Sequence, residues 1–118
     1  MANDKDFVVN GPVVVGKDTK VTVGSISSSA INLATGNYFD DTLAADTTYT
    51  ISNAGAVQAF QLEVTGASTY TITWPSSIEW AGGVAPAAPA NGETDVYTFT
   101  TDDTGTSYTG VKSIDNAS

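Results

Sequence analysis

The stretch TYTITWPSSIEWAGG, residues 69–83, carries the clearest secondary-structure signal in this chain. Its apolar side chains at 70, 72 and 74 alternate with threonines, which is the period-two pattern of a half-buried β-strand. Pro75 ends this strand because proline has no backbone N–H to donate to a sheet. A second short strand follows at residues 78–80, before a pair of glycines. We therefore expect the core sheet of the protein to form around these aromatic residues.

Alternating strands flank this stretch on both sides. Residues 57–65, VQAFQLEVT, place their apolar side chains on one face, and residues 66–68 predict a hairpin into the strand that begins at residue 69. Residues 95–101 alternate again, and an Asp/Gly turn leads from them to a last strand at 106–111. We predict that the core contains the residues on the shared apolar faces, which are Phe60, Leu62, Val64, Tyr70, Ile72, Tyr97 and Phe99.

Regularly spaced turns divide the rest of the chain into short strands. Between residues 30 and 53, apolar residues alternate around two turns, and no window shows apolar residues at helical spacing. Residues 81–92, AGGVAPAAPANG, form a long irregular loop that Pro86 and Pro89 exclude from a central strand. We predict an all-β fold, with an antiparallel β-sandwich or jelly-roll-like knob over residues 27–118.

The first 26 residues form an N-terminal β-arm in this prediction. Residues 7–16, FVVNGPVVVG, hold two apolar runs that a turn separates, and residues 20–26 add a third short run. Such narrow strands do not bury themselves. They either pair with the sandwich of the same chain or are completed by another subunit, and the sequence leaves both open. We assign partner binding to the apolar side chains of the arm, which are Phe7, Val8, Val9, Val13, Val14 and Val15.

The composition argues against several classes of partner. The chain has 118 residues, of which 41% are hydrophobic and 14% charged, so we expect one domain rich in strands. The net charge is −9, and three of the four cations, Lys5, Lys17 and Lys20, lie around the arm. We therefore expect a basic end on an acidic body. We expect neither nucleic acid nor a membrane as a partner, because phosphates require clustered cations and no apolar stretch is long enough to span a bilayer.

No residue pattern predicts an enzyme. The chain has no histidine and no cysteine, which excludes Ser-His and Cys-His nucleophiles and zinc sites built on imidazole or thiolate. We interpret the acidic pairs Asp40-Asp41 and Asp102-Asp103 as solvated turn residues, with calcium binding at the second pair as the alternative. We predict no catalytic residue, no cofactor and no metal.

The two tryptophans, Trp74 and Trp80, have two interpretations. A tryptophan at the end of a strand usually packs in the core, and we expect this for both. Exposed tryptophans can instead stack on sugar rings or anchor a partner.

Residues 73–111 resemble the C-terminal sheet of a family of small β-rich virion proteins of tailed phages. In that family a W-P-x-x-x-x-W-x-G-G-x-x-P loop precedes a D-V-x-x-F strand and a D-D-x-G-T turn. Residues 31–53 look like the preceding part of the same module, and residues 7–16 are similar to the valine repeats of phage fibre shafts and attachment arms. This chain matches the pattern at Trp74, Pro75, Trp80, Gly82, Gly83, Pro86, Asp95, Val96, Phe99, Asp102, Asp103, Gly105 and Thr106.

The resemblance implies a non-enzymatic bacteriophage structural protein, made in the host cytoplasm and located on the outer capsid surface of the virion. As a capsid decoration or cement protein it would staple neighbouring capsid subunits, with the major capsid protein and other copies of itself, as a homotrimer, for partners. The alternative is a tail-fibre or head-fibre tip that binds a host-surface receptor or glycan. In that case Trp80, Tyr108 and the loop at residues 81–92 would form the contact surface.

Overall fold

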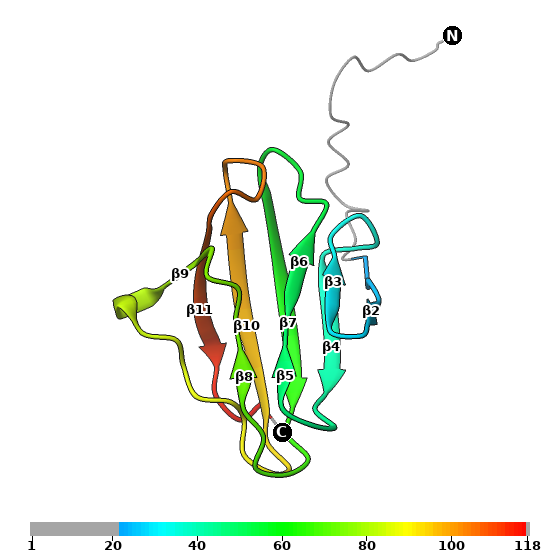
Figure 1. Cartoon of the computed structure of the whole chain (residues 1–118), viewed down its shortest axis with the longest axis vertical. Coiled ribbons are helices and arrows are strands. Elements are labelled where there is room, and N and C mark those ends of the chain that lie inside the picture. The colour runs from blue at the N-terminus through cyan, green and yellow to red at the C-terminus, as the bar shows by residue number, and fades with distance from the viewer. Residues whose placement is uncertain (1–21, 118) are drawn as a thin grey trace, which may run out of the picture.

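The computed structural model describes residues 22–117, and nearly all of their regular secondary structure is β-strand (Figure 1). No helix within this range is long and apolar enough to cross a membrane. Residues 22–117 contain one short 3-10 helix, η1 (Ala81–Gly83). The strands are β2 (Ile26–Ser27), β3 (Ala30–Asn32), β4 (Tyr38–Thr42), β5 (Thr47–Thr48), β6 (Thr50–Ser52), β7 (Gln58–Thr65), β8 (Ile72–Thr73), β9 (Ile78–Trp80), β10 (Thr94–Thr101) and β11 (Tyr108–Ile114).

A five-stranded sheet in the order β4-β7-β10-β11-β9 is the main layer of the fold (Figure 1). Two small sheets, β2-β3-β6 and β5-β8, pack against one face of it, since Ile31 and Tyr49 share a core with Phe60 and Phe99. The predicted all-β sandwich is thus confirmed. The sheets are mixed, however, and not wholly antiparallel. Strand β10 pairs antiparallel with β7 and β11, whereas β4-β7, β9-β11, β3-β6 and β5-β8 are parallel.

The core lies on the inner face of β7 and β10, as the alternation predicted. Along β7, Phe60, Leu62 and Val64 are at most 1% exposed, and across the ladder Phe99 lies opposite Phe60 with their ring centroids 4.9 Å apart. Tyr97 and Phe99 are fully buried. Tyr70 and Ile72 are only partly buried and pack on the margin of this core, so their predicted core position is confirmed in part.

The predicted hairpin between residues 57–65 and 69–74 is wrong. Strand β7 pairs with β10 and β4 instead, and β8 pairs over two residues with β5. The reason lies at Gly66, whose N–H donates to the Glu93 carbonyl and whose carbonyl accepts from Gly92. A Cβ at this glycine would lie 2.3 Å from the carbonyl oxygen of Ala90, so the backbones approach closely here. The end of the 81–92 loop therefore holds Gly66 and directs the chain away from β7.

The first described residues, 22 and 23, lie along the β4 edge of the main sheet. The Thr22 carbonyl accepts hydrogen bonds from the N–H groups of Asn37 and Tyr38, and Val23 forms a parallel bridge with Tyr38. The prediction places residues 22–26 in the arm, whereas in the structure they pair with the body and Ile26 packs against its core. The assigned partner-binding residues, Phe7, Val8, Val9, Val13, Val14 and Val15, lie outside the described range.

Candidate functional site

The face of the main sheet opposite the core is a candidate surface for binding, because two hollows lie on it. The register places threonines from β10 and β11 side by side on it, with Thr98 opposite Val111 and Thr100 opposite Thr109. Side chains bond across the strands, since Gln61 Nε2 donates to Thr98 Oγ1 at 3.3 Å and Thr98 Oγ1 donates to Ser113 Oγ at 3.0 Å. These bonds fix uncharged polar side chains around Thr98, whereas Asp40 and Glu63 in the β4-β7 pair and Glu79 in β9 place acidic side chains elsewhere on this face.

Two hollows interrupt this face, one on each side of Thr98. The larger, of about 390 Å³, lies over β9, β10 and β11, and the smaller, of about 240 Å³, lies over β7 and its neighbours. Glu79 is the one charged residue that lines the larger hollow. Its other lining residues are Trp80, Ala81, Thr98, Thr100, Thr109, Gly110 and Val111. The sequence analysis missed this threonine-rich hollow, because its residues come together only through the pairing of three strands.

The two aromatic residues predicted for a surface contact differ in their exposure. Trp80 is half-buried and lines the larger hollow, so it can reach a partner. Tyr108 is only 4% exposed, and its ring packs edge-on against Phe60 with the centroids 6.1 Å apart. The register explains the difference, because Tyr108 faces the core side beside Ile78. The expectation of a surface contact at Tyr108 is therefore wrong.

Both tryptophans belong to an aromatic cluster at the margin of the core. The Trp74 ring centroid lies 4.9 Å from that of Tyr97, 5.1 Å from that of Trp80 and 5.4 Å from that of Tyr49. Trp80 also meets Phe99 at 5.5 Å. Contacts at these distances and tilted angles are favourable for aromatic rings. The predicted packing role is confirmed for both side chains, although neither is fully buried.

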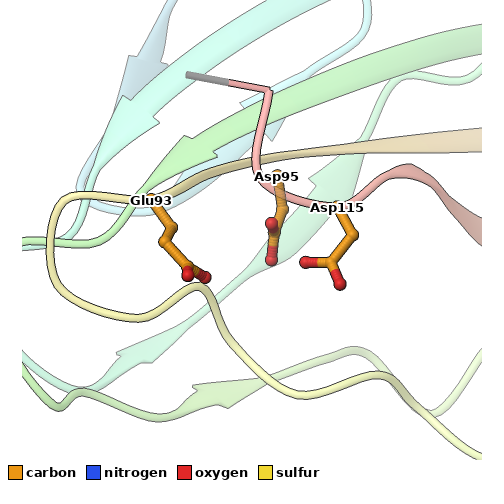
Figure 2. Close-up of side chains that lie close together, drawn as sticks. All are labelled: Glu93, Asp95 and Asp115. Atoms are coloured by element: carbon orange, nitrogen blue, oxygen red, sulfur yellow. The ribbon is translucent and has the colours of Figure 1, made fainter.

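Three carboxylates meet at one end of the main sheet, where the chain enters β10 and leaves β11 (Figure 2). Oxygen atoms of Glu93, Asp95 and Asp115 lie within 4.8 Å of one another, and Asp95 is fully buried. The local sequence pattern does not predict this cluster either. Asp95 begins a strand that the sequence predicts, but Asp115 lies four residues beyond the predicted end of the last strand at residue 111, because β11 extends to Ile114.

Lys112 supplies the counter-charge for this acidic cluster. Its Nζ lies 2.9 Å from Asp95 Oδ2 and 3.8 Å from Asp115 Oδ1. Asp95 Oδ2 receives no well-directed hydrogen bond, so its pairing with the ammonium is electrostatic, while Oδ1 accepts the N–H of Asn116 at 2.9 Å. Burial, followed by the charge of Asp95, raises the pKa of the nearby Tyr97 hydroxyl. The cluster thus acts as a clamp that ties the end of β11 to β10.

The acidic turn at residues 102–105 is organised by Asp103. Its Oδ1 accepts the Ser107 N–H and the Thr101 hydroxyl, both at 2.9 Å, and its Oδ2 accepts the Ser107 hydroxyl at 2.7 Å. These bonds, led by the one from the Ser107 backbone, lower the pKa of the Asp103 carboxyl below its usual value of 3.8. Both carboxylate oxygens are thus used to close the β10-β11 turn.

Protonation of Asp103 should destabilise the fold. A carboxyl whose pKa is lower in the folded state contributes stability that is fully present above the unfolded-state pKa, and that is lost as the pH falls through the folded-state pKa. We expect Asp103→Asn to flatten the loss of stability between about pH 5 and about pH 2, measured by urea unfolding at several pH values. The exposed neighbour offers a matched control, and Asp102→Asn should leave the profile unchanged. Identical acid profiles for Asp103→Asn and the wild type would contradict this role.

The other acidic pair lies within a strand, and not at a turn as we had interpreted it. Asp40 and Asp41 belong to β4 and point to opposite faces of the sheet. Asp41 Oδ2 accepts the Tyr49 hydroxyl at 2.7 Å, and burial together with this bond raises the pKa of Tyr49. Asp41 therefore satisfies a buried hydroxyl, and Asp40 is exposed.

Comparison of the chain with protein-family models, with curated proteins and with solved structures finds no match.

Proposed function

We propose that this chain is a non-enzymatic structural protein of a bacteriophage virion, of the capsid decoration or cement class. In this role the N-terminal arm binds the outer capsid surface, and the body that begins at residue 22 is displayed. The observation that carries the proposal is the construction of the core. The buried core consists of residues between Ile31 and Tyr108. Residues of the same range also cover it, since Tyr49 and Trp74 lie over Phe99 and its neighbours. On this basis we propose that the apolar runs of the arm serve to bind a partner.

The residues behind the resemblance to phage virion proteins support a structural role. Trp74 and Trp80 build the aromatic cluster, and Asp103 closes the β10-β11 turn. Gly82 and Gly105 adopt φ angles of 76° and 80°, a left-handed conformation that favours glycine. Each of these residues shapes the fold, and the proposal of a displayed structural body accounts for all of them.

The distribution of charge supports display of the body and attachment by the arm. Residues 1–21 contain three lysines and three aspartates, so this segment has no net charge, and the expected basic end is not basic overall. The whole formal charge of −9 lies on the remaining residues. Acidic bodies repel one another and stay solvated, whereas a neutral valine-rich segment can approach another protein surface.

Deletion of residues 1–16 should abolish binding to the parent phage particle and leave the body folded. The expected result is loss of the protein from sedimented particles, with a β-type circular dichroism spectrum unchanged from that of the full chain. A matched variant of full length, with the six apolar arm residues replaced by serine, should also fail to bind. If the deleted protein decorates particles at wild-type occupancy, the body holds the anchor and the proposal is wrong.

The second candidate function is a fibre tip that binds a host-surface glycan. The observation that favours it is the larger hollow, which combines an indole with threonine hydroxyls and the Glu79 carboxylate. Aromatic rings can stack on sugar rings, and such hydroxyls and carboxylates can bond to sugar hydroxyls. Binding of neutral oligosaccharides that Thr109→Val weakens, by a chain that does not bind capsids, would favour this candidate over the first.

A further inference from the structure

We infer that Val13, Val14 and Val15 of a second copy add as a strand to the edge of β11 at residues 111–114. This inference rests on the proposed role of the arm as the assembling element. It goes further by naming one partner of the arm, the part of the arm that is used, and the strand that accepts it.

The acceptor is an edge that β9 leaves uncovered. Strand β9 pairs with β11 only from Tyr108 to Gly110, and the chain then turns away through η1. Strand β11 continues to Ile114, and within residues 22–117 this last part pairs only with β10. Val111 and Ile114 are 43% and 47% exposed here. An edge with unpaired backbone groups and exposed apolar side chains is a template for strand addition.

The side chains at this edge favour an apolar strand. Lys112, the residue that would place a charge over the edge, is turned toward Asp95 and is held there by the ion pair. Val111 also borders the larger hollow, beside Thr109 and Thr98. Alternate side chains of an added strand would pack over Val111 on that face. A run of valines suits this position, since β-branched side chains pack well on a pleated surface.

The register of the sheet indicates that the valines come from a second copy. Val23, where the body begins, lies in one row with Tyr38, Gln61, Thr98 and Val111 across the whole sheet. The arm therefore leaves at one edge, and the acceptor lies at the other. A strand added beyond Val111 would be five strand spacings from Val23, or about 24 Å.

The arm of the same copy is barely longer than the distance that it would have to cover. Val14 and Val23 are nine positions apart, and a fully extended chain of that length spans at most about 32 Å. Little of this length would remain for the chain to pass over the face of the sheet and then turn into the direction of the strand. If the β4 edge of a neighbouring copy faces this β11 edge, the arm of that neighbour has only a short distance to cross. Such a contact is head-to-tail, and it would form the expected trimer if its rotation closes after three copies.

Charge and spacing further divide the arm between two partners. Residues 13–15 are uncharged, so they can approach the acidic body without repulsion. The three-residue run matches the short open edge, and the turn at residues 10–12 separates it from Phe7, Val8 and Val9. The outer run then stays available for the capsid.

Disulfide trapping tests the contact directly, because the chain has no cysteine of its own. Two differently tagged full-length proteins, one with Val14→Cys or Val13→Cys and one with Val111→Cys, are mixed, dissociated, reassociated and oxidised. We expect a disulfide between the two tagged chains for one of the two arm positions. The matched control replaces the acceptor by Val57→Cys, at a valine that is 75% exposed and directly precedes β7, and it should give no cross-link.

Mass in solution provides the second test. The wild-type chain should be an oligomer at micromolar concentration by light scattering, and Ile114→Lys should reduce it to a monomer, while Val57→Lys should not change its mass. A monomeric wild type would overturn the inference. So would a doubly substituted Val14→Cys, Val111→Cys chain that forms its disulfide within one copy.

The outcomes separate this inference from the proposed function. An oligomer that shows the arm-to-β11 disulfide but does not bind particles would retain the inference and reject the capsid role. Loss of particle binding on arm deletion, without any arm-to-β11 disulfide, would retain the capsid role and reject the inference.

Discussion

Replacing Phe99 by alanine should lower the free energy of unfolding by about 3–5 kcal/mol. This ring is fully buried at the centre of the inner face. It stacks on Phe60 and contacts Trp74 and Trp80. Removal of the ring loses its transfer free energy and leaves a cavity that rigid aromatic neighbours cannot fill. Urea unfolding followed by tryptophan fluorescence and by circular dichroism would measure the loss.

The adjacent residue of the same strand provides the matched control. Thr100 lies on the opposite face of β10 and is exposed, so Thr100→Ala should change the free energy of unfolding by less than about 1 kcal/mol. Phe60→Ala, across the ladder, should behave like Phe99→Ala. A loss below about 1 kcal/mol for both phenylalanine variants would mean that the core lies on the other face of this sheet.

Replacing Lys112 by methionine should also destabilise the protein by about 3–5 kcal/mol, although it removes a side chain from the margin of the fold. The ammonium is the counter-ion of Asp95, whose carboxylate is fully buried. Without Lys112 this carboxylate stays in a poorly solvated site next to two other acids. The cost therefore comes from the charge that remains and not from the lost contact.

A double-mutant cycle separates these two contributions. Adding Asp95→Asn to Lys112→Met removes the buried charge, so the double variant should regain much of the stability that Lys112→Met loses. Lys112→Arg keeps a cation at this position and should be less destabilising than methionine. Strictly additive effects of the Asp95 and Lys112 substitutions would show that the two groups do not interact.

The sequence was informative where structure depends on local alternation. The faces of β7 and β10 follow from the period-two pattern of Phe60, Leu62, Tyr97 and Phe99, and the β10-β11 hairpin follows from its Asp/Gly turn. The pattern says which side of a strand is apolar but not which strand lies beside it. For this reason the parallel pairings were not predicted, and the hairpin after β7 was predicted wrongly.

The candidate sites show the same limit. Trp80 could be predicted as both a packing and a contact residue, because its type and position suggest both. The burial of Tyr108 depends on its row in the sheet, which only the pairing with β9 reveals. The acidic clamp likewise joins Glu93 and Asp95 to Asp115 across an antiparallel pair whose register is shifted by a bulge. No local pattern encodes such a shift.

The pairing of β7 with β10 also governs the order of events during folding. Even the nearest residues of this ladder, Thr65 and Thr94, are 29 positions apart, and β4-β7 and β9-β11 are likewise joined by distant segments. Chains dominated by such non-local pairings fold in milliseconds to seconds, because long loops must close before the contacts form. On the ribosome, β7 can pair in the main sheet only with β4 until residues 94–101 have emerged. A nascent chain that pauses before that point lacks Tyr97 and Phe99, so the apolar face of Phe60, Leu62 and Val64 is only partly covered and is open to chaperones and to aggregation.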